Sequence, residues 1–275
     1  MAGTLTRGTP DRPAPLEQVL EHAAPHSTPQ PARTAAAAVP PSPSVGEDWC
    51  RPTREELAQL EPFVGLQMDE VRVPATPEEA HAALAELSRH AWLGFDTESK
   101  PTFARGESSS GPHLVQFATL EGAFLFQLKR AECLEAVRAL LARPDLLKVG
   151  FGLDTDLTQL EARLGCRPQA VLDLDEIFRR RGYGRSLGVK NAVAIVFGQQ
   201  FHKSRRMTTS NWGEPRLSER QLLYAANDAY AAARVYHELG TPPPPPVEIP
   251  VPKPPSRHRF RRRRRSAAGT PADES

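Results

Sequence analysis

Two acidic residues, Asp96 and Glu98, stand two positions apart at the end of the run Trp92-Leu93-Gly94-Phe95. That run is mostly apolar and β-like, which predicts a buried strand. Side chains two apart on a strand point to the same face, so both carboxylates would project together. Like charges held so close repel unless a cation lies between them, which suggests a metal site. Two solvated acids at a strand end are the commoner explanation of such a pair taken alone.

A second pair of acids, Asp154 and Asp156, follows the run Leu147 to Phe151. This run predicts another buried strand, which would deliver the acids to the start of a helix over residues 153–164. Asp154 is the expected N-cap of that helix. Asp156 lies in the first turn, where it could face the same cleft as the first pair. Spacing alone leaves the choice between the two acids open.

A tyrosine and an acid, Tyr224 and Asp228, lie four residues apart in the last long helical pattern. The capping box Ser218-x-x-Gln221 opens this helix, which is expected to run to Leu239 and to end at Gly240. Residues four apart share a helical face. The neighbouring residues of the helix are largely apolar, so an acid among them needs a partner. The alternative is a core tyrosine beside a solvated acid.

A basic segment with Lys203, Arg205 and Arg206 precedes Asn211-Trp212. In a substrate cleft Lys203, Arg205 and Arg206 would contact phosphates, although a solvated basic loop explains them equally well. Trp212 is interpreted first as a packing anchor and second as a surface on which a base stacks. Three cysteines without C-x-x-C spacing, and histidines without H-x-x-x-H spacing, indicate neither a zinc site nor a disulfide framework.

The elements that must position these residues alternate between strands and helices. Strands are predicted over 71–73, 92–97, 113–119, 123–128 and 147–151, with a short strand or turn at 171–174; helices are predicted over 55–60, 77–89, 131–142, 153–164, 176–180, 187–197 and 219–239. The tight turn at 120–122 makes its two strands antiparallel neighbours, whereas a β-α-β crossover from Ala123 to Phe151 requires parallel strands. The expected fold class is α/β, with a mixed sheet flanked by helices.

Proline divides the 275-residue chain into three parts. Of 28 prolines, only eight lie in residues 54–239. A Pro/Ala-rich arm over 1–53 is expected to be disordered, and residues 54–240 to form the domain. Residues 241–275 would be a proline-rich linker followed by a basic tail, with seven arginines between Arg257 and Arg265. The tail sums to +5 and the rest to −3, which favours a tethered contact with nucleic acid over a merely solvated tail.

Several classes of protein are excluded by the same composition. Residues 1–12 carry charges and no apolar segment, so they do not indicate a secretory signal. An apolar run of about 18 residues is lacking, so no membrane partner is expected. The expected location is inside the cell, in the cytoplasm, or in a nucleus if the arginine cluster is a targeting signal.

The motifs together resemble a known family, the DEDDy 3′-5′ exonucleases of the ribonuclease-H-like fold. The likeness is strongest to Werner-type exonuclease domains, with ribonuclease D as a cousin, and covers roughly residues 70–239. The matching stretches, in the family's order, are Gly94 to Glu98, Lys148 to Asp156, Ser210-Asn211-Trp212 and Tyr224 to Tyr230. Leu223 stands where the histidine branch of the superfamily has its histidine.

The resemblance implies five catalytic residues, which are Asp96, Glu98, Asp156, Tyr224 and Asp228. Its four acids would hold two divalent cations, Mg²⁺ or Mn²⁺, with Asp156 rather than Asp154 as the second-motif acid. Tyr224 would stay protonated and orient the attacking water. The implied reaction releases nucleoside monophosphates from a 3′ end without a small-molecule cofactor.

Alternatives to this implied function remain. DNA is slightly favoured as substrate, and a ribonuclease-D-like activity on RNA is the first alternative. A non-catalytic nucleic-acid-binding module is the second, although clustered carboxylates without metal would repel. The chain departs from many relatives at Ser99, where they carry a tryptophan, and the polar segment from there to Gly111 is expected to be flexible.

Overall fold

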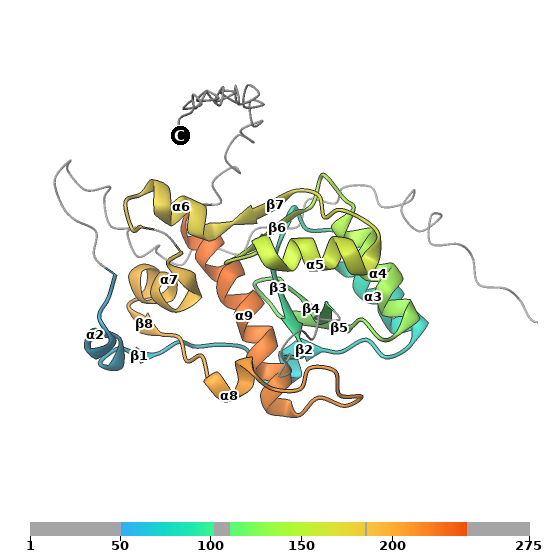
Figure 1. Ribbon diagram of the computed structural model, residues 1–275, viewed down its shortest axis with the longest axis horizontal. Coiled ribbons are helices and arrows are strands. Elements are labelled where there is room, and N and C mark those ends of the chain that lie inside the picture. Colours follow the sequence, from blue (N-terminus) through green and yellow to red (C-terminus); the bar gives the residue numbers. More distant parts are fainter. Residues whose placement is uncertain (1–50, 102–110, 185, 241–275) are drawn as a thin grey trace, which may run out of the picture. The chain divides into compact units, whose positions relative to one another are not determined.

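The computed structural model describes residues 51–101, 111–184 and 186–240 (Figure 1). The predicted basic tail, most of the predicted N-terminal arm and most of the polar segment after Ser99 lie outside these residues. At the start of the described chain, Thr53 caps α2 (Arg54–Ala58), close to the helix expected there. Within the described ranges, no helix is both long enough and apolar enough to cross a bilayer.

A six-stranded mixed sheet forms the centre of the fold, in the order β2-β5-β4-β3-β6-β7. Its strands are β2 (Val71–Arg72), β3 (Trp92–Ser99), β4 (Pro112–Ala118), β5 (Ala123–Gln127), β6 (Leu147–Gly150) and β7 (Val171–Asp173). β4 pairs antiparallel with both β3 and β5, and the other neighbours are parallel. The predicted mixed sheet is therefore confirmed.

The predicted crossover from β5 to β6 is present, but the two strands are not neighbours. They run in the same direction, and β4 and β3 lie between them in the sheet. The antiparallel β3-β4-β5 meander fills that space, so the helix α4 (Ala131–Leu141) spans two strands before β6 joins the free side of β3. This connection makes β3 the central strand, flanked by hydrogen-bonded neighbours on both sides.

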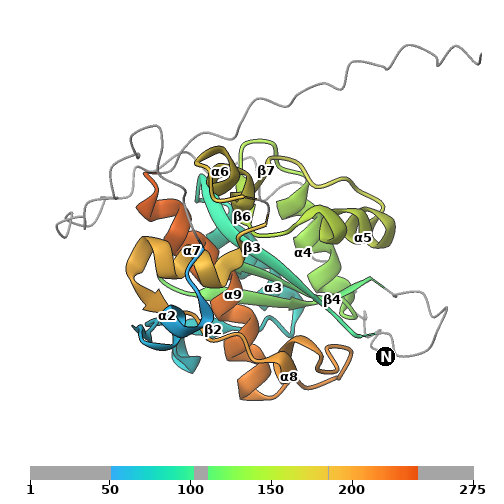
Figure 2. The same ribbon diagram turned by 60° about the vertical axis from the view of Figure 1, so that its left-hand side comes forward.

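Helices cover both faces of the sheet (Figures 1 and 2). α3 (Pro77–Leu87), α4 and α5 (Asp154–Leu164) pack on one face, against side chains such as Phe95, Phe117 and Phe126. The other face meets the long helix α9 (Glu219–Glu238), beside which lies α7 (Gly188–Phe197). Among the described residues, the remaining helices are α6 (Leu174–Arg180), α8 (Arg205–Thr208) and the 3₁₀ turn η1 (Met68–Glu70).

α9 approaches the sheet closely because small residues line the contact. Its Ala225, Ala226 and Ala229 are fully buried against the sheet. A Cβ at Gly94 of β3 would overlap the carbonyl oxygen of Ala229, so only glycine fits there. This contact sets how far the end of β3 lies from α9.

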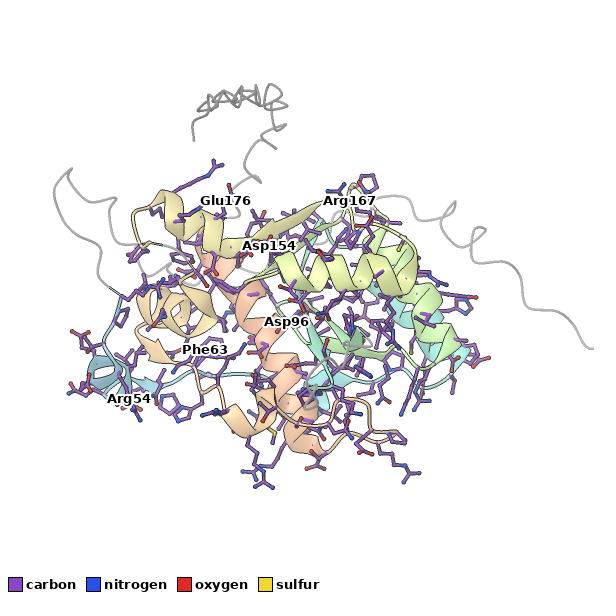
Figure 3. All side chains as sticks on the ribbon, in the orientation of Figure 1. Arg54, Phe63, Asp96, Asp154, Arg167 and Glu176 are labelled. Carbon is purple, nitrogen blue, oxygen red and sulfur yellow. The ribbon has the colours of Figure 1, made fainter. Side chains whose placement is uncertain are left out.

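The helix caps agree with the sequence at two positions and differ at a third. Thr76 accepts a hydrogen bond from Glu79 N–H, and Ser218 forms the predicted capping box with Gln221. The N-cap predicted at Asp154 is wrong, because α5 begins at that residue and its side chain is exposed (Figure 3). Asp173 of β7 holds the start of α5 instead, because its carboxylate accepts a hydrogen bond from Leu153 N–H at 3.0 Å. A neighbouring strand thus replaces the local cap.

A small parallel ladder that the sequence did not reveal joins β1 (Glu61–Pro62) to β8 (Gln199–Gln200). After it the chain runs alongside α9, where Leu66 N–H donates to Asn227 Oδ1 at 2.7 Å. Asn227 stands between Tyr224 and Asp228 in sequence. The segment before β2 is therefore attached to the same helix that carries two of the candidate catalytic residues.

Candidate active site

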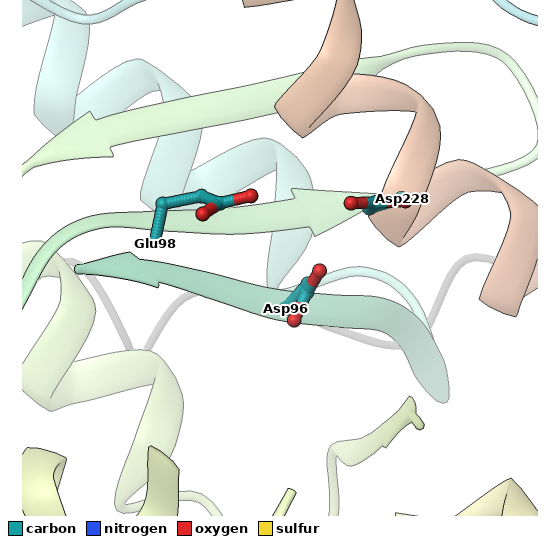
Figure 4. A group of neighbouring side chains, drawn as sticks. All are labelled: Asp96, Glu98 and Asp228. Atoms are coloured by element: carbon teal, nitrogen blue, oxygen red, sulfur yellow. The ribbon is translucent and has the colours of Figure 1, made fainter. Parts of the chain in front are cut away.

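Three of the predicted acids converge where β3 meets α9. Asp96 and Glu98 project from one face of β3, and Asp228 reaches toward them from α9 (Figure 4). One carboxylate oxygen from each of the three lies within 4.8 Å of the other two. The two-residue spacing on the strand places the first pair, and the close contact at Gly94 brings the third.

The three carboxylates lie in a site that disfavours their charge. Glu98 is 9% exposed and Asp228 4% exposed, and Asp96 is half-buried. Burial raises the pKa of Asp96, and the neighbouring Asp228 carboxylate raises it further. The pKa of Glu98 is raised by burial and then by Asp96, and that of Asp228 by burial. A divalent cation between them would relieve both the burial cost and the repulsion.

Asp156 lies beside this cluster and is joined to it through Thr97. Thr97 Oγ1 donates a hydrogen bond to Asp156 Oδ1 in the first turn of α5. As the middle residue of Asp-Thr-Glu, Thr97 points to the opposite face of β3 from its two acidic neighbours. Burial raises the pKa of Asp156, while the Thr97 bond lowers it. Thr97 was not among the residues predicted for the site, although a hydroxyl between two acids of a strand is a signal visible in the sequence.

Lys203 brings a positive charge to the acids. Its Nζ lies 3.1 Å from Asp228 Oδ2 and 6.0 Å from the centre of the Tyr224 ring. Burial opposes its charge, but Asp228 and Asp96 outweigh that cost and raise the pKa of Lys203. The side chain stays 35% exposed, so the ammonium can also reach a ligand at the mouth of the site.

Tyr224 lies one helical turn before Asp228 on α9. Its hydroxyl is 2.9 Å from Thr208 Oγ1 at the end of α8. Burial, and then the charge of Asp228, raise the pKa of Tyr224, so the phenol stays protonated at neutral pH. A protonated phenol can donate to a water molecule or to an oxyanion.

The other candidate nucleic-acid-binding residues differ in how exposed they are. Arg206 is exposed and lines a hollow of about 600 Å³ that Tyr224 also borders. Arg205 is exposed at the start of α8. Trp212 is 1% exposed and packs on the buried face of α9, which favours the preferred interpretation as a packing anchor over a surface on which a base stacks.

The acidic cluster fits a divalent cation. Carboxylate oxygens are the ligands that Mg²⁺ and Mn²⁺ prefer, and three of them converge here. Asp228 Oδ1 is buried and has no hydrogen-bond partner among the described residues. A buried acceptor that the protein leaves unpaired is costly, and coordination to a cation would satisfy it.

A mixed sheet that carries acids on its central strand and on a crossing helix defines the ribonuclease-H-like class of nucleases. Residues 71–241 match the family model described as "3'-5' exonuclease", which covers more than half of the chain. The chain belongs to this family, as the resemblance of its motifs predicted.

Individual relatives agree with this assignment. The chain is 27% identical over 216 residues to the exonuclease mut-7 homolog of Aedes aegypti, covering 69% of this chain and 28% of that protein. It is 26% identical over 150 residues to the mouse bifunctional 3'-5' exonuclease/ATP-dependent helicase WRN, covering 54% and 11%. The chain therefore spans less than a third of either relative.

A solved structure shares the fold. Trypanosoma brucei RNase D, in complex with RNA U12, superposes with a TM-score of 0.56 at 21% identity. The superposition covers 72% of this chain and 67% of that one. At this identity the likeness concerns the fold alone.

Proposed function

We propose that this protein is a metal-dependent 3′-5′ exonuclease that removes nucleoside 5′-monophosphates from the 3′ end of nucleic acid. The convergence of Asp96, Glu98 and Asp228 carries the proposal. A structural role would not bring together three carboxylates, two of them buried, because their repulsion costs stability. Family membership supplies the reaction class.

Asp96, Glu98 and Asp228 would hold the cation, with Asp156 holding a second one directly or through water. Two divalent cations would activate a water molecule and stabilise the charge that develops on the phosphate and on the leaving oxygen. By the family resemblance, the Asp96 carboxylate would contact both cations. The Thr97 hydroxyl orients the Asp156 carboxylate.

Tyr224 and Lys203 would act on water and phosphate rather than on the cations. The protonated Tyr224 hydroxyl would orient the attacking water. The hydrogen bond between Tyr224 and Thr208 would hold that hydroxyl in place. Lys203, which already neutralises Asp228, would contact a phosphate oxygen of the substrate. Arg206 would contact a phosphate farther from the scissile bond.

A single experiment tests the assignment. Single-stranded and recessed DNA and RNA oligonucleotides labelled at the 5′ end are incubated with the full chain in Mn²⁺, Mg²⁺ or chelator. A ladder that shortens from the 3′ end only with metal, and that Asp96→Ala and Asp228→Ala abolish, is expected. Binding without shortening in either metal would leave a nucleic-acid-binding module and overturn the catalytic proposal.

DNA is the first substrate we propose, and RNA is the second candidate. The likeness to an RNase D structure that contains RNA favours the second candidate. Rates on matched DNA and RNA oligonucleotides in the same experiment decide between them. Tyr224→Phe serves as the matched variant for the water-orienting role, because it removes one hydroxyl and leaves the acids in place.

A further inference from the structure

A buried glutamine, Gln116, lies in the layer between the sheet and α9. Gln116 is 0% exposed. Neither Oε1 nor Nε2 of its carboxamide has a hydrogen-bond partner among the described residues. Leaving such a group unpaired destabilises the folded protein, and an apolar side chain of the same shape would avoid this cost. The position therefore calls for a polar partner that the protein's other groups do not supply in this arrangement.

The register of the sheet identifies the neighbours of Gln116. Gln116 of β4 pairs directly with Asp96 of β3, and with Leu125 of β5 on its other side. Directly paired residues share a face, and their Cβ atoms are about 4.5 to 5.5 Å apart. Gln116 thus stands beside Asp96 on the face that α9 covers.

The rest of that face offers little else that is polar. Leu114, Ala118 and Leu125 belong to the same buried cluster as the alanines of α9. Two other polar groups reach this layer: the indole N–H of Trp212, which has no hydrogen-bond partner among the described residues, and the carboxamide of Gln127. The acids of the cluster are the charged groups beside Gln116. Of these, Asp96 is the immediate cross-strand neighbour.

A second buried glutamine of the same sheet provides a comparison. Gln127 of β5 is 4% exposed, and its Nε2 donates to Glu214 O at 3.2 Å. Gln127 therefore has a structural partner away from the acids, whereas Gln116 has none among the described residues. This difference indicates that the Gln116 carboxamide interacts with the acids and does not serve packing alone.

We propose that Gln116 is a positioning residue of the acidic cluster. Its amide N–H would donate to the Asp96 carboxylate and fix the direction in which that carboxylate presents an oxygen to a divalent cation. Asp96 Oδ1 already accepts from Thr97 N–H at 2.9 Å, so the other oxygen is available to Gln116. A carboxylate held by two donors cannot rotate away from a cation, and loss of such a partner commonly lowers metal affinity about 10- to 100-fold. The inference rests on the proposed function.

The test measures Mn²⁺ binding to the full chain by electron paramagnetic resonance, without substrate. Gln116→Met keeps the shape of the side chain and removes the donor, and Gln127→Met is the matched control. We expect Gln116→Met to weaken Mn²⁺ binding about 10- to 100-fold without lowering the melting temperature. Gln127→Met should lower the melting temperature and leave Mn²⁺ binding unchanged. Unchanged Mn²⁺ binding in folded Gln116→Met would overturn the proposal.

A second variant covers the case in which Gln116→Met does not fold. Gln116→Asn keeps the carboxamide but shortens its reach by one methylene, and it should also weaken Mn²⁺ binding. Wild-type affinity in this variant would equally overturn the role of Gln116.

The proposed function is judged separately, by comparing the wild type with Asp96→Asn. If both fail to bind Mn²⁺, the metal site itself is refuted. If the wild type binds Mn²⁺ and the Gln116 variants match it, only the role of Gln116 is refuted.

Discussion

The acids Asp96, Glu98 and Asp228 are grouped in a way that favours chemistry over stability. Each has a raised pKa, and burial is the largest cause in each case. In the unfolded chain these side chains would ionise near pH 4. The folded protein without metal therefore binds more protons than the unfolded chain above that pH. The stabilisation that these protonated acids give the folded state is therefore largest at low pH. It is lost as the pH rises through their raised pKa values.

A substitution that removes one of these charges should stabilise the metal-free protein. Asp96→Asn keeps the size of the side chain and ends its repulsion with Asp228. In chelator at about pH 8, we expect its melting temperature to exceed that of the wild type by a few degrees. The wild type should also melt at a lower temperature at about pH 8 than at about pH 6, and the variant should show a smaller difference. Equal pH dependence in the two proteins would contradict the assigned repulsion.

Lys203 should matter to nucleic acid more than to the fold. We expect Lys203→Met to weaken binding of an oligonucleotide, and to lower the slope of log affinity against log salt concentration by about one. Filter binding in Ca²⁺ over a salt series measures this slope. The exposed Lys190→Met on α7 serves as a control and should leave the slope unchanged. If the two variants behave alike, Lys203 does not contact a phosphate.

The contact between β3 and α9 places two chemically important elements in fixed relation. α9 carries Tyr224 and Asp228, while β3 carries Asp96 and Glu98. Where they cross, Gly94 leaves no room for a Cβ, and Ala233 Cβ would lie 2.9 Å from one. The distance between the acids therefore depends on a residue that takes no part in the chemistry.

Gly94→Ala should separate these elements. The added methyl overlaps the Ala229 carbonyl, so α9 must shift from the sheet, at a cost of about 1 to 3 kcal/mol or more. Because catalysis depends on positions to within about an ångström, kcat should fall about 100-fold. Urea unfolding and steady-state kinetics measure the two effects.

Gly198→Ala is the control for Gly94→Ala. Gly198 ends α7 at φ +62° with no atom within 4 Å of an added Cβ, so it should cost about 1 kcal/mol without changing kcat. An unchanged kcat in Gly94→Ala would show that the crossing does not position Asp228.

The molecule as a whole is proposed to divide into a catalytic domain over residues 54–240 and two flanks, 1–53 and 241–275. The described strands and helices all lie between Arg54 and Glu238. The sequence concentrates its positive charge beyond residue 240, so the tail would strengthen binding to polyanions without taking part in the site.

A fragment of residues 54–240 should therefore melt within a few degrees of the full chain and bind Mn²⁺ with the same affinity. Its affinity for oligonucleotides should be lower, with a weaker dependence on salt, because the basic tail is missing. Calorimetry measures the melting temperature and the Mn²⁺ affinity, and the same salt series measures oligonucleotide binding. A fragment that does not fold would place essential contacts in the flanks, and an unchanged salt slope would remove the proposed role of the tail.

The sequence by itself determined the types and order of the elements and the residues worth testing. Period-two and helical patterns, capping boxes and short turns are local, so they can be read without knowing which segments meet. They located β3, α9 and the acids that each carries. The motif resemblance, confirmed by the family match, supplied the reaction class.

The tertiary structure alone decided which of these residues meet. Sequence spacing did not show that Asp173 would replace Asp154 at the start of α5, or that Thr97 would bind Asp156. It also gave no sign that Gln116 would stand beside Asp96. These are contacts between segments far apart in the chain, and they depend on strand order, register and the closeness of α9 to the sheet. Local patterns carry no information on such distances, because burial and packing of the whole core set them.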